Sequence, residues 1–154
     1  MKLLNQLGVK TIHQNNIIYI DSSTINTYYT SSELVKSMRA SVLLLSTLVD
    51  RLGQAKICIP GGYPIGDRPI DLHISALKRL GVSFTLEYIE IYAVIKGQLK
   101  GAHIFMNKKS VGATLTVMCA ATLAIGNTII ENAAQEPEVI DTAQFINILG
   151  AKIY

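Results

Sequence analysis

The chain repeats one pattern of hydrophobic and polar positions: an apolar, helix-like stretch ends at a glycine, and an alternating, strand-like stretch follows. The glycines that mark this change are Gly8, Gly81 and Gly150. A glycine just past a helix supplies the left-handed backbone conformation that ends it. The two intervals between these glycines are nearly equal, and Gly53 and Gly126 are separated by the same interval as Gly8 and Gly81. The sequence therefore predicts a structural unit that recurs along the chain.

Each unit is predicted to combine a pair of strands with two helices. Alternating apolar residues place strands at residues 9–13, 17–21, 56–59, 82–86, 89–95 and 128–132. Helical spacing places helices at about residues 31–52, 69–80, 110–125 and 137–149. Thr30 and Glu33 have the spacing of a capping box for the first of these helices, and Gly53 is expected to end it.

Two of the predicted helices are apolar on nearly every side, around residues 42–45 and 117–125. A helix without a polar face must be enclosed by other elements. We therefore expect these two helices at the centre of an α/β fold, with the strands and the remaining helices outside them.

The two ends of the chain interrupt the repeat. The helix before Gly8 keeps only residues 1–7, whereas its counterparts extend over residues 69–80 and 137–149. An isolated helix of about two turns is not stable in water. Residues 1–154 are therefore expected to form a single, incomplete domain.

The composition is that of a globular protein, because 49% of the 154 residues are hydrophobic and 16% are charged. The net charge of +3 is spread along the chain, with no basic run longer than Lys108–Lys109, which favours small anions over nucleic acid as partners. No apolar run reaches the roughly 20 residues that cross a bilayer, and no signal peptide is evident. We therefore expect a cytoplasmic location.

The cysteines and histidines give no sign of a metal site. Cys58 and Cys119 lie in apolar surroundings without a CxxC pattern, which predicts small core residues rather than ligands, nucleophiles or a disulfide. His13, His73 and His103 lack metal-ligand spacing. His73 shares a predicted helix face with apolar residues, which is typical of a packing role.

Two segments and one arginine are candidates for binding an anion. Residues 60–69 combine three glycines with three prolines, so this loop either lets backbone N–H groups approach a ligand or is a tight surface turn. Residues 108–112 begin a buried helix, and they form either a phosphate or diphosphate cradle or a solvated basic turn capped by Ser110. Arg39 lies in an apolar helix, where its charge must find an anion or reach solvent.

Seven short segments together resemble a known family: residues 38–41, 60–62, 65–74, 99–104, 110–114, 118–124 and 128–134. They look like the UDP-N-acetylglucosamine 1-carboxyvinyltransferases, which are enolpyruvyl transferases. The resemblance implies a partial inside-out α/β barrel of βαβαββ repeats with central apolar helices. The chain would hold about two of the three repeats of one domain, and the family's second domain would be absent.

The resemblance also implies a reaction, in which the enolpyruvyl group of phosphoenolpyruvate passes to the 3-hydroxyl of UDP-N-acetylglucosamine and phosphate is released. This is the first committed step of peptidoglycan synthesis, and it needs no metal or organic cofactor. By position, two arginines would bind phosphoenolpyruvate and phosphate: Arg39 and Arg68. Contacts to the UDP-sugar would come from Arg68, Asp71, Leu72, His73, Lys108, Ser110, Val111 and Gly112.

One residue departs from the family pattern at the position that matters most for catalysis. Tyr63 stands where the family carries its catalytic cysteine. A phenol with a pKa of about 10 is a poorer proton donor near neutral pH than a tuned thiol, and it cannot form a thioether adduct. A Lys-Asn motif of the family and the second domain, which supplies a catalytic aspartate, would also be missing.

Three interpretations follow from these departures. The first is a truncated and catalytically impaired transferase. The second is a non-catalytic module that binds UDP-N-acetylglucosamine. The third is one half of a split enzyme, completed by another chain. Strand edges and apolar helix faces left uncovered would favour self-association in each case.

Overall fold

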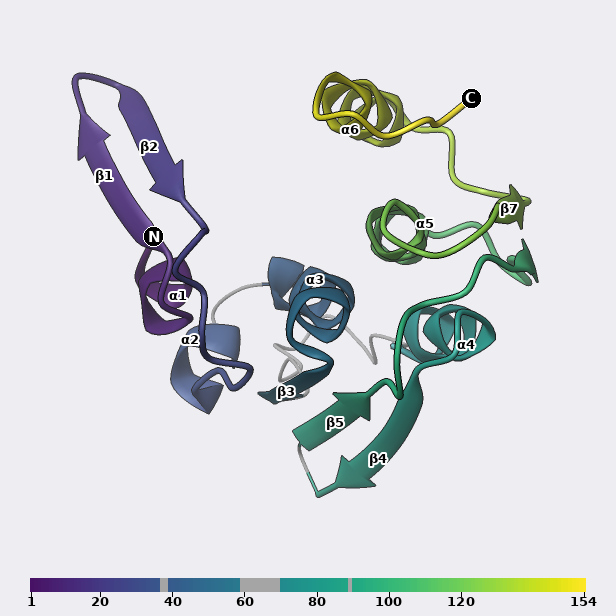
Figure 1. Cartoon of the computed structure of the whole chain (residues 1–154), viewed down its shortest axis with the longest axis horizontal. Helices are drawn as coiled ribbons and strands as arrows, with labels where there is room; N and C mark the ends of the chain where they lie inside the picture. The colour runs from purple at the N-terminus through teal and green to yellow at the C-terminus, as the bar shows by residue number, and fades with distance from the viewer. Residues whose placement is uncertain (37–38, 59–69, 89) are drawn as a thin grey trace.

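The structure, a computed structural model, describes residues 1–36, 39–58, 70–88 and 90–154 (Figure 1). Its helices are α1 (Lys2–Gln6), α2 (Ser32–Lys36), the 3-10 helix η1 (Arg39–Val42), α3 (Leu43–Leu52), α4 (Asp71–Arg79), α5 (Val111–Ala121) and α6 (Pro137–Ile148). Its strands are β1 (Lys10–Gln14), β2 (Ile17–Asp21), β3 (Gln54–Cys58), β4 (Ser83–Glu87), β5 (Glu90–Val94), β6 (His103–Phe105) and β7 (Ile129–Glu131). The chain is therefore a mixed α/β protein, as the sequence predicts.

The predicted repeat is present in the backbone. Gly8, Gly81 and Gly150 have φ angles of 89°, 102° and 107°, in the left-handed region that glycine tolerates. The residue after each glycine donates its N–H to a carbonyl five residues earlier, at 3.0–3.2 Å: Val9 to Leu4, Val82 to Leu77 and Ala151 to Ile146. Three helices thus end in the same way, which confirms the glycine pattern.

The strands repeat with the same spacing as the glycines. Residues 10–14 and 17–21 form the hairpin β1–β2, and residues 83–87 and 90–94, one repeat later, form the hairpin β4–β5. The second hairpin gains a third strand, because β3 pairs antiparallel with β5 and gives the sheet order β3-β5-β4. Further along the chain, β6 and β7 pair in parallel.

The two apolar helices lie together in the core. α3 packs against α5, β3 and β5, and α5 packs against α3, α4 and α6. Leu45, Leu48 and Val49 of α3 and Ala113 and Val117 of α5 are fully buried. The expectation of enclosure therefore holds for one face of each helix, whereas Leu123 and Ile125, in the second apolar stretch, are 67% and 60% exposed.

The prediction of one continuous helix over residues 31–52 is wrong. In the described residues, α2 ends at Lys36, and the 3-10 helix η1 precedes α3. Serine is a poor helix former because its hydroxyl competes for backbone hydrogen bonds, and Ser41 lies within η1. The prediction that this stretch ends at Gly53 is confirmed, since Gly53 has a φ of 74° at the C-terminus of α3.

The prediction of a capping box at Thr30 and Glu33 is also wrong. The Thr30 hydroxyl is buried and has no hydrogen-bond partner within the described residues. The Thr30 N–H donates to the carbonyl of Lys56, and Tyr29 forms a parallel bridge with the same residue. Thr30 therefore belongs to an extended segment beside β3 rather than to a helix start.

The predicted helix over residues 110–125 is shorter than expected, because α5 ends at Ala121. A turn follows, and Ile125 then forms a parallel bridge with Lys100. The chain must leave the helix early to reach this bridge. The pairing cannot be read from local periodicity, since its partner lies in a much earlier part of the sequence.

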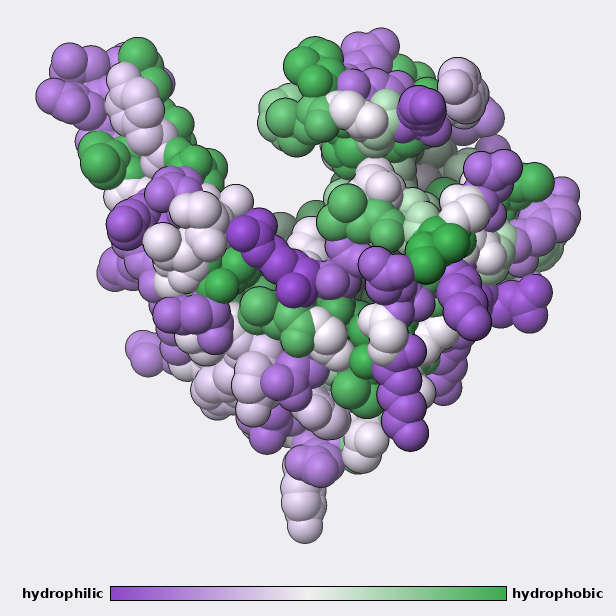
Figure 2. All heavy atoms as spheres, viewed as in Figure 1, coloured by the Kyte–Doolittle hydropathy of each residue, from purple (hydrophilic) through white to green (hydrophobic). Residues whose placement is uncertain are grey.

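Two parts of the molecule expose apolar side chains that their repeat counterparts bury. Ile18 on β2 is 53% exposed, whereas its counterpart Ile91 on β5 is 0% exposed. Leu149 after α6 is 70% exposed, whereas Leu7 and Leu80 are 0% exposed. Figure 2 shows the β1–β2 hairpin and α6 as two arms on either side of a wide hollow.

Candidate functional site

The N-terminal ends of α4 and α5 carry most of the residues predicted to bind a nucleotide sugar. The two helices pack against each other (Figure 1). The structure places these predicted residues at or just before the two helix starts: Asp71, Leu72, His73, Lys108, Ser110, Val111 and Gly112. Two segments that are well separated in the sequence are thus combined at one place.

His73 joins the two helices. Its Nδ1 atom lies 2.8 Å from the Thr116 hydroxyl on α5. Gly112 makes this approach possible, because a Cβ atom at that position would lie 3.1 Å from the His73 Cε1 atom and 3.3 Å from Nε2. A larger residue at position 112 would push the imidazole away from α5.

The hydrogen bonds around Thr116 fix the tautomer of the neutral imidazole. The Thr116 hydroxyl donates its single proton to the carbonyl of Gly112 at 3.0 Å. It must therefore accept a hydrogen bond from His73, so Nδ1 carries the proton. The Nε2 atom of His73 is left as a hydrogen-bond acceptor beside the start of α5.

Burial lowers the pKa of His73, and the nearby carboxylate of Asp71 opposes this effect only in part. The imidazole is half-buried between α4 and α5, where a positive charge is poorly solvated. Near neutral pH the ring is therefore neutral. It can position a ligand group by accepting a hydrogen bond, and it adds no positive charge to the site.

The start of α5 has the features of an anion-binding helix end. Ser110 is its N-cap, and the Ser110 hydroxyl accepts a hydrogen bond from the N–H of Ala113 at 3.3 Å. The N–H groups of Val111 and Gly112 have no acceptor among the described residues. Lys108 is exposed just before the helix. Free amides, a positive helix dipole and a lysine together favour a negatively charged ligand.

The remaining predicted site residues are not placed by the structure. Tyr63 and Arg68 lie outside the described residues. The backbone of Arg39 begins the 3-10 helix η1, but its side chain is not described. The predicted contacts of Arg39 and Arg68 with phosphoenolpyruvate and phosphate therefore stay predictions.

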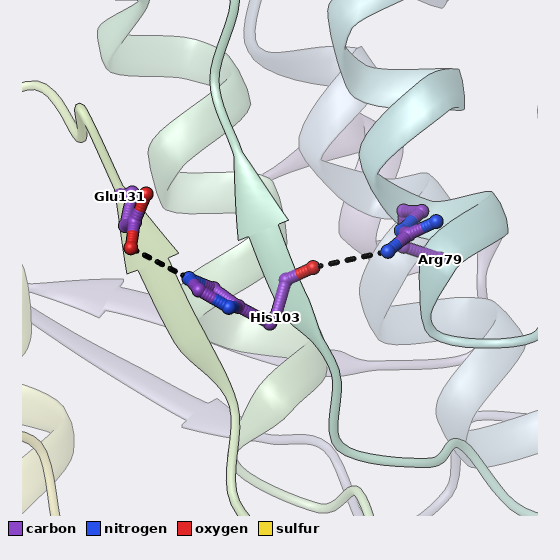
Figure 3. Close-up of polar contacts among 3 residues, drawn as sticks. All are labelled: Arg79, His103 and Glu131. Atoms are coloured by element: carbon purple, nitrogen blue, oxygen red, sulfur yellow. Dashed lines mark hydrogen bonds and ion pairs between the residues drawn. The ribbon is translucent and has the colours of Figure 1, made fainter.

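A second concave surface, which the sequence does not predict, lies between α4, β6 and β7. This groove of about 420 Å³ begins at Leu72 and passes Arg79, His103 and Glu131. In Figure 3, Arg79 Nη2 donates to the His103 carbonyl at 3.3 Å, and His103 Nε2 lies 2.8 Å from Glu131 Oε1. The three residues come from three elements, so no spacing in the sequence could reveal them. Arg79 binds a neutral carbonyl and Glu131 binds the imidazole of His103, so no ion pair joins the guanidinium to the carboxylate in the described residues.

Both cysteines in the structure carry free thiols. Cys58 is buried, and Cys119 is half-buried, with a pKa that burial raises. No group of three His, Cys, Asp or Glu side chains in the described ranges is arranged to hold a metal ion. Among the helices of the described ranges, none combines the length and the apolar character needed to cross a membrane.

Comparison with known proteins defines the class to which this fold and site belong. A family model described as EPSP synthase (3-phosphoshikimate 1-carboxyvinyltransferase) matches residues 1–154. The chain therefore belongs to this family of carboxyvinyl, or enolpyruvyl, transferases.

Within the family, the chain is similar to proteins named UDP-N-acetylglucosamine 1-carboxyvinyltransferase. It is 54% identical to the protein of Tolumonas auensis and 56% identical to those of Erwinia tasmaniensis and Escherichia fergusonii, each over 153 residues. Each match covers 99% of this chain and 36% of the relative, so the chain spans about a third of the length of these relatives. The resemblance noted in the sequence is confirmed.

Two solved structures have the same fold at low sequence identity. The enolpyruvyl transferase NikO from Streptomyces tendae gives a TM-score of 0.85 at 19% identity, and the match covers 99% of this chain and 36% of that structure. EPSP synthase from Acinetobacter baumannii gives a TM-score of 0.70 at 17% identity, with coverage of 99% and 35%. These matches support an enolpyruvyl transferase fold for the chain.

Proposed function

We propose that this chain provides the UDP-N-acetylglucosamine-binding side of an enolpyruvyl transferase. The observation that carries the proposal is the junction of α4 and α5, where His73 lies beside the free N-terminal amides of α5. The chain that forms this junction is 54–56% identical to proteins named for that substrate. The reaction would transfer the enolpyruvyl group of phosphoenolpyruvate to the sugar 3-hydroxyl, release phosphate and commit the sugar to peptidoglycan synthesis.

Each polar group at the junction has a distinct role in this proposal. The amides of Val111 and Gly112 and the ammonium of Lys108 face a negative charge, which the diphosphate of the nucleotide sugar would supply. The Nε2 atom of His73 accepts a hydrogen bond from a hydroxyl or an N–H group of the ligand. Asp71, exposed in the first turn of α4, is a second acceptor. The site would thus bind the diphosphate at one helix and donor groups at the other.

The finer architecture belongs to the same proposal. The residues would form about two of the three repeats of a partial inside-out α/β barrel, as one incomplete domain. Arg39 and Arg68 would bind phosphoenolpyruvate and phosphate beside the nucleotide sugar, and Arg68 would also contact the sugar nucleotide.

We expect no turnover by residues 1–154 alone. Tyr63 replaces the reactive cysteine of the family, and a phenol is a weak proton donor near neutral pH. Closing a second domain over the substrates excludes water and assembles the charged site, and residues 1–154 alone would not supply that second wall. The assay is phosphate release from phosphoenolpyruvate. Release that requires UDP-N-acetylglucosamine would contradict the expectation.

A second candidate function is binding without catalysis, in a UDP-N-acetylglucosamine-binding module or in one half of a split enzyme that another chain completes. Tyr63 favours the module, because it replaces the catalytic cysteine of the family, whereas the junction keeps the residues that match the family's sugar-nucleotide contacts. Recovery of phosphate release on addition of a second chain would favour the split enzyme instead.

The binding proposal is tested by thermal unfolding with and without millimolar UDP-N-acetylglucosamine. A ligand that binds the native state stabilises it by about 2.7 kcal/mol at 100 times its Kd. We expect the midpoint to rise for the unmodified chain and for Lys109→Ala, and to rise much less for Lys108→Ala. Lys109 is the matched control, because it is the exposed neighbour of Lys108. An unchanged midpoint for the unmodified chain would refute the proposal.

A further inference from the structure

The groove between α4, β6 and β7 is a concave surface that nucleotide-sugar binding leaves unused, apart from Leu72 at one end. Its volume of about 420 Å³ is within the range of small-molecule sites in proteins. Its walls combine apolar and polar side chains, and those that matter here are Leu72, Phe105, Met106, Arg79, His103 and Glu131. Such walls are typical of a site that buries the body of a small ligand and orients it by a few polar contacts.

The internal repeat contains a filled version of the same surface. In the first unit, α2 packs against α1 and β3. Leu3 on α1, Val35 on α2 and Cys58 on β3 form a buried apolar cluster there. In the second unit, residues 106–110 connect β6 to α5 without forming a helix. The surface that α2 covers in the first unit is therefore open in the second.

The positions that form this cluster carry different side chains one repeat later. Leu3 corresponds to Ala76, Cys58 corresponds to Glu131, and Val35 falls at residues 108–109, which are two exposed lysines. A small side chain and charged ones thus replace the apolar groups that hold α2 in place. The groove and its filled counterpart both lie within the described residues, so the opening follows from the sequence of the second unit itself.

Arg79 gives the groove a positive charge that no described residue neutralises. Its Nη2 atom donates to a neutral group, the His103 carbonyl, at 3.3 Å, and no ion pair joins it to a carboxylate in the described ranges. A guanidinium has five N–H donors, so the others stay available. Two parallel N–H groups of a guanidinium bind a carboxylate or a phosphate in bidentate geometry. This end of the groove therefore favours an anionic group.

Glu131 gives the groove a hydrogen-bond acceptor. Its Oε1 atom lies 2.8 Å from His103 Nε2, whereas its Oε2 atom has no partner in the part of the chain that the structure describes. Figure 3 shows Arg79 and Glu131 on opposite sides of His103. A ligand that contacts both residues must therefore be elongated, with an anionic group at one end and a donor at the other.

We propose that this groove binds a small organic acid, with its carboxylate or phosphate at Arg79 and a hydroxyl group at Glu131. The apolar body of the acid packs against Leu72 and Phe105, and the 63% exposure of Phe105 leaves its ring available to an aromatic ligand. Only Leu72 is shared with the predicted nucleotide-sugar contacts. The groove can therefore bind such an acid whether or not a nucleotide sugar binds at the α4–α5 junction.

Titration of the ¹⁵N-labelled chain, followed by NMR, tests this assignment with three probes. 4-Hydroxybenzoate carries the carboxylate, 4-hydroxyphenyl phosphate carries the phosphate, and 4-hydroxybenzamide is the uncharged control. We expect at least one acid to shift the signals of Arg79, His103 and Glu131, and the acid with the lower Kd identifies the anionic group. The amide should bind about tenfold more weakly or less, because it lacks charge-assisted hydrogen bonds.

Three outcomes of the titration would overturn the assignment. The first is that neither acid shifts the groove signals. The second is that the amide binds as tightly as the acids. The third is that the shifts are confined to residues 110–112, which would place the acids at the start of α5.

Variants on α4 locate the binding residue. Arg79→Gln should raise the Kd of the acid about tenfold or more, because it removes the charged donor. Lys78→Gln is the matched control, because it removes the same charge from an exposed neighbour on the same helix, and it should leave the Kd within about twofold. If Arg79→Gln disturbs the fold, Ser75→Phe replaces it, since Ser75 is exposed and lines the groove. Its ring should block binding. An unchanged Kd in a folded Arg79→Gln or Ser75→Phe chain would refute binding in this groove.

Discussion

Replacing Gly101 with alanine should destabilise the fold through a backbone clash. A Cβ atom at position 101 would lie 2.7 Å from the carbonyl carbon of Asn127 and 2.8 Å from its nitrogen, and closer still to its carbonyl oxygen. Ordinary contacts begin at 3.4 Å, so the backbone of Asn127 would have to move by at least 0.7 Å, the difference between 3.4 and 2.7 Å.

Two hydrogen bonds hold Asn127 in place and set the size of the effect. The Gly101 N–H donates to the Ile125 carbonyl at 2.8 Å, and the Ile129 N–H donates to the Ala102 carbonyl at 3.0 Å. Breaking both costs about 1–3 kcal/mol, and forcing atoms into a packed site costs a similar amount. Alanine recovers about 0.4–1 kcal/mol by restricting the unfolded chain. The expected net loss is about 1–5 kcal/mol of unfolding free energy.

Urea unfolding followed by circular dichroism measures this loss against Gly97→Ala. Gly97 has a φ of 89°, and no atom lies within 4 Å of the added Cβ. Alanine at this position therefore costs only about 1–2 kcal/mol, because it must adopt a left-handed backbone conformation. The same restriction of the unfolded chain offsets part of this cost. Gly101→Ala should therefore be the less stable variant. If it were as stable as Gly97→Ala, the close approach between residues 101 and 127 would not exist as described.

Three further predictions test the repeat and the site. Leu80→Ala should cost about 2–5 kcal/mol because Leu80 is fully buried, whereas Leu149→Ala, at the matching but exposed position, should change stability by less than about 0.5 kcal/mol in the same urea assay. Ser110→Ala removes the α5 cap and should cost about 0.5–2 kcal/mol of unfolding free energy, measured by thermal unfolding. Because burial lowers the pKa of His73 in the folded state, the unfolded chain binds a proton first as pH falls. The stability that neutral His73 provides is present above its unfolded pKa of about 6.5, and it is lost as the pH falls toward the lower folded pKa. In a plot of the unfolding free energy from urea against pH, His73→Gln should therefore have a smaller slope in this range.

The sequence was sufficient to predict the repeat because its signal is local. A helix that ends in a left-handed conformation requires glycine at one position, and the bond across Gly8, Gly81 or Gly150 spans only five residues. Strand alternation is equally local, and the hairpin β1–β2 was located to within one residue at each end. The start of α5 was predictable for the same reason, since Ser110 acts on the N–H three residues later.

Features that depend on distant parts of the chain could not be predicted in this way. Thr30 has the local spacing of a cap, yet a bridge between residues 29 and 56 draws the backbone at this point toward β3. His73 was expected to pack on its own helix face. Its hydroxyl partner Thr116, 43 residues away, became evident only in the structure. The same holds for Arg79, whose acceptor is a carbonyl of β6.

The contacts that stabilise the α4–α5 junction lie away from the exposed strand edges. The junction rests on residues that the described part of the chain buries completely, including Leu77 on α4 and Val117 on α5. Gly112 lets the helices approach closely enough for His73 to reach Thr116. The hydrogen bond and the glycine contact that join the two helices involve residues of α4 and α5 alone. Covering the exposed edges, by a second copy or by another segment, should therefore change assembly and global stability without altering the geometry that we propose for nucleotide-sugar binding.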